Sequence, residues 1–212
     1  MKITKLIHSC LLVEMPAPVN RTALFDPGVM SEAAIDVGSL VFLDNIIITH
    51  NHADHMSLPL IRQLADKFPD VRITATVEVC AQLKEAGIEA VSEETPGITL
   101  FESPHADVEP LFQVPQQRGV HYLDLLTDPG DSHDFHETKP VLALPVTAPW
   151  GSTVQAVKTA LELKPKYIIP VHDWHYSDAA RKQMYEILEK AFAAHDITFL
   201  KPETGVAIVL NI

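Results

Sequence analysis

The stretch from Ile46 to Met56, with the sequence Ile-Ile-Ile-Thr-His-Asn-His-Ala-Asp-His-Met, decides how the rest of the chain is interpreted. Its short run of β-branched residues is typical of a buried strand. Four potential metal ligands follow the run within six positions: His50, His52, Asp54 and His55. Sites in α/β proteins usually lie at the carboxyl ends of strands, and packing alone does not require these residue types. We therefore interpret the stretch as the nucleus of an active site.

The spacing of these four residues suits metal coordination. His50 and His52 are two positions apart, so their side chains face the same way where the backbone is extended. Histidine is the usual neutral metal ligand, and carboxylates complete such sets. One ion cannot comfortably use all four groups, whereas two adjacent ions could if other segments supply further donors.

Further donors follow later predicted strands. His105 comes after a strand predicted at 98–101, Asp131 after one that ends near 127, and His172 after an apolar strand at 167–170. Each donor stands just past a strand, where the nucleus also stands. We expect these three side chains to contribute to the same site.

Apolar periodicity and turn residues predict a chain in which strands alternate with helices. The predicted strands are 2–7, 10–14, 22–25, 45–48, 71–76, a short one near Ala90, 98–101, 141–144, 167–170, 197–200 and 206–210. A strand pair is predicted at 108–127, with its turn at 115–119. Helices are predicted after Ser57 and at 77–86, 153–163 and 177–194, with a short one within 29–45. The pattern favours one α/β domain spanning 1–212, with two sheets and helices outside.

Composition narrows the class of partner. The net charge of -12, from 16 basic and 28 acidic residues, opposes binding to nucleic acid, which depends on Lys and Arg. No segment approaches the roughly 20 apolar residues that span a bilayer, and no signal peptide is evident. Only Cys10 and Cys80 are present, and we expect both to be small buried residues rather than a disulfide framework. The cytoplasm is the expected compartment, and the sequence leaves homo-oligomer formation open.

With these residues in view, the chain resembles the metallo-β-lactamase-fold hydrolase superfamily. The resemblance is carried, in order, by Asp26-Pro27-Gly28, by 49–55, by His105, by Gly130-Asp131 and by Pro170-Val171-His172. It runs over nearly the whole chain, and the motif at 49–55 is its most specific part. The chain is most similar to the small stand-alone members that are like ascorbate-phosphate lactonase.

The resemblance implies a four-layer αββα sandwich of two mixed sheets with a two-metal site. By this mapping one ion is held by His50, His52 and His105. The second ion is held by Asp54, His55 and His172, and Asp131 bridges the two. The nucleophile would be a hydroxide shared by the ions, and Asp54 or Asp131 would relay its proton. The ions are expected to be zinc, with manganese or iron as alternatives; Asp26 is expected to be a supporting or turn residue.

Several aromatic and histidine residues are candidates for substrate contact. His8 lies between two early predicted strands, Trp150 lies in a loop after a strand, and Trp174 and His175 follow His172 closely. Pocket walls commonly use such side chains, although a structural role is an equal alternative for the tryptophans. The roles of His121, His133 and His136 stay open.

Departures from family patterns narrow the expected function. His105 is followed by Ala-Asp-Val and not by Thr-Pro-Gly, which argues against hydroxyacylglutathione hydrolysis; His52 stands where diiron oxygen reductases of this fold carry glutamate. The leading hypothesis is a two-metal hydrolase of a small metabolite ester, lactone or phosphorylated substrate. The alternatives are a phosphodiesterase on a nucleotide or phospholipid-like head group, and a metal-containing binding protein without catalysis.

Overall fold

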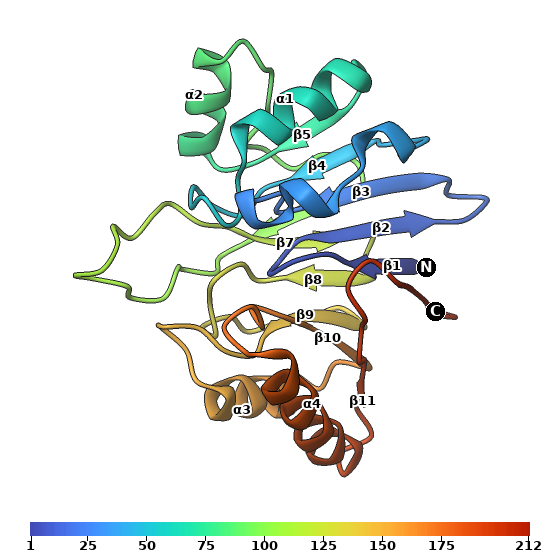
Figure 1. Ribbon diagram of the computed structural model, residues 1–212, viewed down its shortest axis with the longest axis vertical. Helices are drawn as coiled ribbons and strands as arrows, with labels where there is room; N and C mark the ends of the chain where they lie inside the picture. The colour runs from blue at the N-terminus through green and yellow to red at the C-terminus, as the bar shows by residue number, and fades with distance from the viewer. The chain divides into compact units, whose positions relative to one another are not determined.

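The computed structural model describes residues 1–212, which form two compact units. The first unit comprises 1–94 with 202–212, and the second comprises 95–201. Each unit holds one mixed six-stranded sheet with α-helices beside it (Figure 1). The predicted α/β composition with two mixed sheets is therefore confirmed. No helix combines the length and apolar character that crossing a bilayer would need.

The sheet of the first unit is antiparallel at one side and parallel at the other. Its strands are β1 (Lys2–Lys5), β2 (Leu11–Met15), β3 (Arg21–Phe25), β4 (Asn45–Ile47), β5 (Arg72–Thr74) and β12 (Ala207–Val209). They lie in the order β12-β1-β2-β3-β4-β5, in which β4 runs parallel to both β3 and β5. The carboxyl ends of these three parallel strands therefore meet at one edge, where the ligand stretch begins.

Helix α1 (Leu58–Lys67) begins immediately after the ligand stretch. Ser57 caps it, because its Oγ accepts a hydrogen bond from the backbone N–H of Leu60 at 3.2 Å. Pro59 stands in the first turn, where its missing N–H costs nothing. The ligand loop is thus closed by a strand at one end and by a capped helix at the other.

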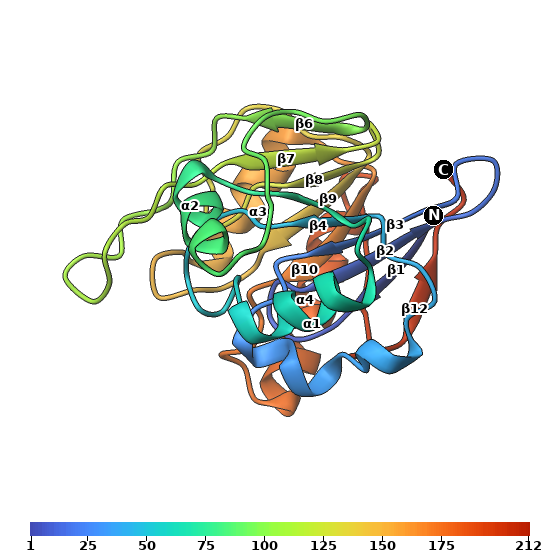
Figure 2. The same cartoon turned by 90° about the horizontal axis from the view of Figure 1, so that it is seen from above.

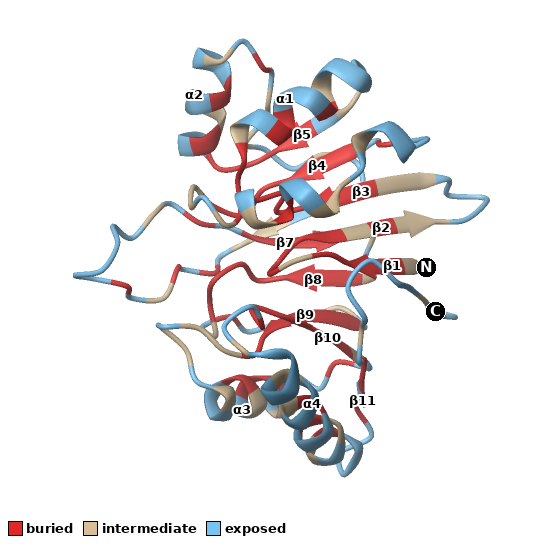
Figure 3. Cartoon of the chain, viewed as in Figure 1, coloured by how far each residue is buried: buried red, intermediate tan, exposed pale blue.

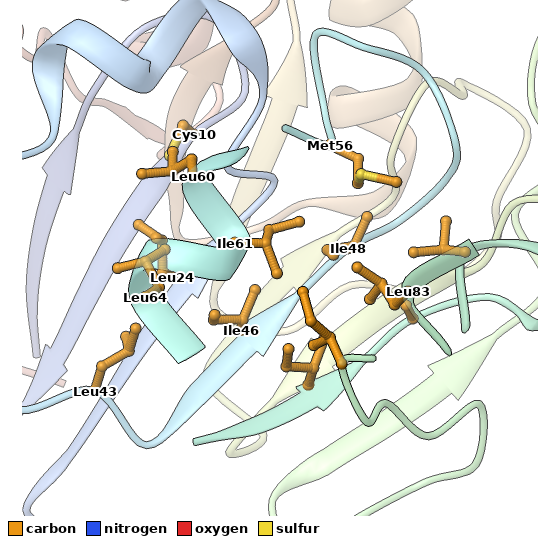
Figure 4. Packing of buried hydrophobic residues seen from close by; sticks show 14 of the residues in the cluster. Cys10, Leu24, Leu43, Ile46, Ile48, Met56, Leu60, Ile61, Leu64 and Leu83 are labelled. Atoms are coloured by element: carbon orange, nitrogen blue, oxygen red, sulfur yellow. The ribbon is translucent and has the colours of Figure 1, made fainter. Parts of the chain in front are cut away.

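The apolar face of α1 anchors this loop to the sheet. Leu60, Ile61 and Leu64 are buried, and they face strand residues that include Leu24 and Ile46 (Figure 4). Burying each such side chain contributes roughly 1.5–3 kcal/mol. Helix α2 (Val77–Glu85), capped by Thr76, adds Val79 and Leu83 to the same cluster, and two 3-10 helices, η1 (Val29–Ala34) and η2 (Val37–Ser39), provide the short helical structure expected within 29–45.

The sheet of the second unit is likewise antiparallel at one side and parallel at the other. Its strands are β6 (Ile98–Phe101), β7 (Gly119–Tyr122), β8 (Leu126–Asp128), β9 (Val141–Pro145), β10 (Tyr167–Val171) and β11 (Thr198–Phe199). They lie in the order β11-β10-β9-β8-β7-β6, with β7 antiparallel to both neighbours and the others parallel. Helices α3 (Thr153–Leu163) and α4 (Asp178–Ala193) pack on it through residues such as Ala160 and Phe192. Figure 3 shows these strands largely buried and the outer face of α4 exposed.

Two sequence predictions are wrong. The strand pair predicted at 108–127, with its turn at 115–119, lies further along the chain as β7 and β8, and residues 102–118 form a long connection that projects beyond β6 and β7 in both Figure 1 and Figure 2. The reversal lies at Leu123 and Asp124, which have φ of 52° and 54° and carry no Gly or Pro signal. The strand predicted near Ala90 is reduced to an isolated bridge between Val91 and Thr74.

Candidate metal centre

The ligand stretch forms a tight loop between β4 and α1 in the first unit. The carbonyl of His52 accepts hydrogen bonds from the backbone N–H groups of His55 and Met56, at 3.0 and 2.9 Å. His50 and His55 are fully buried, and their ring centroids lie 4.0 Å apart. The ring nitrogens of His50 and His52 approach within 4.8 Å. The loop therefore gathers its histidines as the sequence spacing predicts.

Asp26, at the end of β3, determines which nitrogens these histidines can offer. Its Oδ2 accepts a hydrogen bond from Nδ1 of His55 at 2.7 Å and another from the Thr49 hydroxyl at 2.8 Å. Because that hydroxyl donates to a carboxylate, its oxygen accepts the Nδ1 proton of His50, 3.0 Å away. Both rings thus carry their proton on Nδ1, which leaves Nε2 as the ligand atom. This is the carboxylate–histidine arrangement common around bound metals.

Gly28 lets the Asp26 turn lie against the ligand loop. A Cβ at this position would stand 1.8 Å from the carbonyl oxygen of Asp54. Val29 N–H also donates to the Ala53 carbonyl at 2.8 Å, and Ser57 N–H donates to the Pro27 carbonyl at 2.9 Å. The Asp-Pro-Gly turn is therefore packed backbone to backbone against the loop, which explains its glycine.

His8 lies within this cluster rather than on an exposed surface. It stands between β1 and β2 with φ of 63° and is 1% exposed. Its Nε2 lies 3.1 Å from Oδ2 of Asp54, and a ring nitrogen comes within 4.8 Å of one of His55. Sequence reasoning treated His8 as a substrate-contact candidate, but its position also makes it a potential ligand.

The second unit brings together its own three predicted ligands. Nε2 of His172 lies 2.5 Å from Oδ1 of Asp131, and Nε2 of His105 lies 3.6 Å from Oδ2. All three residues are buried. Nδ1 of His105 donates to the carbonyl of Ala106 at 2.6 Å, so Nε2 is again the nitrogen that can bind a metal. His172 has φ of 59°, so the chain leaves β10 through a left-handed residue that turns this ring toward Asp131.

Of the two tryptophans proposed for substrate contact, Trp150 forms a hydrogen bond with a predicted ligand. Its indole N–H donates to Oδ2 of Asp131 at 3.0 Å, and its ring lies 5.5 Å from that of His172, centroid to centroid. Trp174 is 52% exposed and packs edge-on against the exposed His175. A single sequence cannot separate these cases, because both tryptophans follow strand ends.

A hydrogen bond from helix α4 holds Asp173, the residue after His172. It is buried, and its Oδ2 accepts a hydrogen bond from the Tyr185 hydroxyl at 2.6 Å. Burial, followed by the nearby Asp173 charge, raises the pKa of Tyr185, so the phenol stays protonated and keeps donating. The helical spacing that predicted α4 identified its apolar face but missed this polar contact.

Two of the three histidines with open roles, His121 and His133, are held by contacts within the second unit, and the third, His136, is exposed. His121 is buried in β7, where it stacks on Phe101 and its Nδ1 lies 2.9 Å from the Thr127 hydroxyl. Burial lowers the pKa of His121. Nε2 of His133 donates to the Pro145 carbonyl at 2.8 Å, and burial lowers the pKa of this ring too. His136 is exposed.

Comparison with known proteins identifies the family to which this chain belongs. Residues 2–172 match the family described as the β-lactamase superfamily domain, so the chain belongs to that superfamily. The expected membership of the metallo-β-lactamase-fold superfamily is confirmed.

Individual relatives cover the chain almost completely. Protein Rv0786c from Mycobacterium tuberculosis is 28% identical over 225 residues, covering 97% of this chain and 99% of that protein. The metallo hydrolase Igni18 from Ignicoccus hospitalis has a TM-score of 0.71 at 17% identity, covering 100% of this chain and 98% of that one. An isothiocyanate hydrolase from Delia radicum gut bacteria has a TM-score of 0.68 at 16% identity, covering 99% of each chain. The two structures support the fold.

Proposed function

We propose that this protein is a metal-dependent hydrolase that binds two divalent ions and cleaves a small metabolite ester, lactone or phosphoester. The observation that carries the proposal is the orientation of the predicted ligands. Asp26 and Thr49 place the protons of His50 and His55 on Nδ1, and the Ala106 carbonyl does the same for His105. Ligands held in one tautomer by a neighbouring acceptor are what a metal site needs and what core packing does not require.

We propose the ligand assignment that the family resemblance implies. His50, His52 and His105 are proposed for one ion, Asp54, His55 and His172 for the other, with Asp131 shared. Nitrogen and oxygen donors accept zinc, manganese and iron, and we propose zinc. When bound, such ions lower the pKa of a water molecule and polarise the bond under attack.

The chain's own residues would position substrate and accept protons. We assign proton acceptance to the carboxylates of Asp54 and Asp131. Nε2 of His8 lies 3.1 Å from Oδ2 of Asp54, and the Trp150 indole N–H donates to Oδ2 of Asp131 at 3.0 Å. The Asp131 carboxylate is therefore oriented by a hydrogen bond, and the Asp54 carboxylate has a buried imidazole beside it. His8 is accordingly proposed as a supporting residue, and Trp174 and His175 stay predicted substrate contacts.

A polar groove in the second unit bears on the choice between ester and phosphodiester substrates. The groove has a volume of 820 Å³ and is lined by His105, Trp150, His133, Gln155, Asp107 and Asp134, among others. Two carboxylates face it, and no Lys or Arg lines it. The chain itself supplies no cation here, so any charge compensation for a polyanionic nucleotide would have to come from the bound ions, and the groove supports a carboxylic ester or lactone over the phosphodiester alternative.

The proposal also covers the compartment, the substrate class and the domain organisation of the protein. Both cysteines are free thiols, which suits the cytoplasm. The net charge of -12 supports a small-molecule substrate rather than nucleic acid. We propose a single functional domain, because the predicted ligands come from both parts of the chain.

Metal content and turnover test this function. Protein loaded with Zn²⁺ or Mn²⁺ should hold about two ions per chain and hydrolyse members of a lactone and ester panel faster than bis-nitrophenyl phosphate. Preference for the phosphodiester would favour the alternative substrate class. Two bound ions without turnover of either panel would favour a metal-containing binding protein.

A pair of histidine variants separates the loss of a metal ligand from the general effect of replacing a histidine by alanine. His50→Ala should lose one ion and most activity, because His50 supplies an oriented ligand. His195→Ala is the matched control, since His195 is exposed just after α4 and its backbone N–H bonds to the Phe192 carbonyl, away from the predicted ligands in the sequence. Equal metal content in the two variants would contradict the ligand assignment.

A further inference from the structure

We propose that Gln117 is a positioning residue that sets the spacing of His105 and Asp131. The inference rests on the proposed function, since it takes these two residues as metal ligands. Gln117 lies in the long connection before β7 and is 7% exposed, although its polar surroundings in the sequence predict an exposed turn. A buried neutral amide in such a segment needs a set of hydrogen-bond partners.

The sheet topology creates the problem that Gln117 solves. His105 follows β6 and Asp131 follows β8, but these strands are not neighbours because β7 lies between them. Two strand spacings amount to about 9.6 Å, whereas Nε2 of His105 and Oδ2 of Asp131 lie 3.6 Å apart. The two ligand loops must therefore converge over the amino end of β7. Gln117 stands two residues before that end.

Each polar atom of the Gln117 amide bonds to one of these loops. Nε2 donates to the carbonyl of Ser103 at 2.8 Å and to that of Pro129 at 3.2 Å. Oε1 accepts from the backbone N–H of Asp131 at 2.8 Å. Ser103 and Pro129 each stand two residues before a predicted ligand. One side chain thus ties both loops together close to their metal-binding groups.

Only an amide of this length meets these demands. Two of the three partners are acceptors and one is a donor, so the side chain must supply both kinds of group. Glutamate has the right shape, but its ionised oxygens would face two carbonyl oxygens. Leucine would leave the N–H of Asp131 and the Ser103 carbonyl without this partner. The Ser103 hydroxyl also donates to the Pro129 carbonyl at 2.7 Å, and the backbone N–H of Ala106 donates to the Asp131 carbonyl at 2.8 Å, so the convergence keeps two independent links without Gln117.

Cobalt binding tests the inference without relying on turnover. Gln117→Leu and Gln117→Glu should weaken Co²⁺ binding by about 10- to 100-fold, the usual range for residues that orient ligands. They should also alter the visible absorption spectrum of the bound Co²⁺, which reports ligand geometry. Gln116→Leu is the matched control, because the same chemical change is made at an exposed neighbour. It should leave affinity and spectrum as in the parent protein.

The outcomes distinguish this inference from the proposed function. If the parent protein binds no Co²⁺, both fail. If it binds about two ions and the Gln117 variants keep its affinity and spectrum, only the positioning role is overturned. A variant that loses stability in urea but retains the parent spectrum would show a purely structural role and also overturn it. Should both variants fail to fold, Gln117→Asn, which keeps the amide but is one methylene too short, takes their place with the same expected spectral change.

Discussion

Replacement of Asp26 by asparagine perturbs both oriented histidines of the first unit at once. Three donors converge on this fully buried carboxylate: Nδ1 of His55 at 2.7 Å, and the hydroxyl and backbone N–H of Thr49, each at 2.8 Å. An amide is nearly the same shape but has only one oxygen. The better placement puts that oxygen at the Oδ2 position, where it keeps two donors and turns its NH₂ group toward the Thr49 N–H.

The expected change in the free energy of unfolding combines the loss of a hydrogen bond with the removal of a buried charge. A hydrogen bond to a charged group is worth about 1.5–3 kcal/mol, and the stranded buried N–H adds a further penalty. Removing a buried charge offsets part of this loss. We expect the free energy of unfolding of the metal-free protein to fall by about 2 kcal/mol. Because the imidazoles also lose a charged partner, metal affinity should fall by about 10- to 100-fold.

Urea denaturation of the metal-free protein and competition with a chelator measure the two effects. Asp36→Asn is the control: Asp36 is exposed, accepts one hydrogen bond from Gly38 N–H at 2.9 Å, and an asparagine oxygen can accept it equally. The control should change stability by less than about 0.5 kcal/mol. If Asp26→Asn loses stability but binds metal as tightly as the parent, Asp26 does not orient the ligands and the reasoning fails.

Two further predictions concern backbone contact and pH. Gly28→Ala should cost about 1–3 kcal/mol or more in urea denaturation, because its Cβ would stand 1.8 Å from the Asp54 carbonyl oxygen; a variant as stable as Gly38→Ala, which meets only a side-chain oxygen at 3.0 Å, would refute the close approach. His121 has a pKa lowered by burial in the folded protein, so the unfolded chain binds more protons there and stability should fall as the pH drops below about 6.5. In His121→Gln this pH-dependent loss of stability should be missing. An identical loss of stability from pH 7.5 to pH 5 in the variant and the parent protein would contradict the role of His121.

Much of the site was predictable because its information is local. The strand that ends in His50-Asn51-His52 combines a buried β run with ligands at a spacing that packing does not demand. His105, Asp131 and His172 were found by a weaker signal, their positions just after predicted strands. The structure brings Asp131 together with His105 and His172, as their order along the chain predicts.

The errors lie where local patterns and distant contacts disagree. The Pro and Gln residues at 115–117 have the composition of a turn, yet Gln117 is buried because two ligand loops converge around it. The true reversal at Leu123 and Asp124 lacks Gly and Pro, and strand pairing on both sides holds its positive φ values. Asp26 was expected only to support or turn the chain, and its role became specific once Thr49, 23 positions away, was seen to bond to it.

The sequence alone determined the family, the kinds of metal donor and the elements that carry them, since these depend on residue type and short spacing. Tertiary structure decided which nitrogen His50, His55 and His105 offer, which carboxylate the Trp150 indole orients, and which neutral amide ties two loops together. Those properties depend on hydrogen bonds between residues far apart in the chain. Such bonds form only after folding has buried the partners and removed water as a competitor.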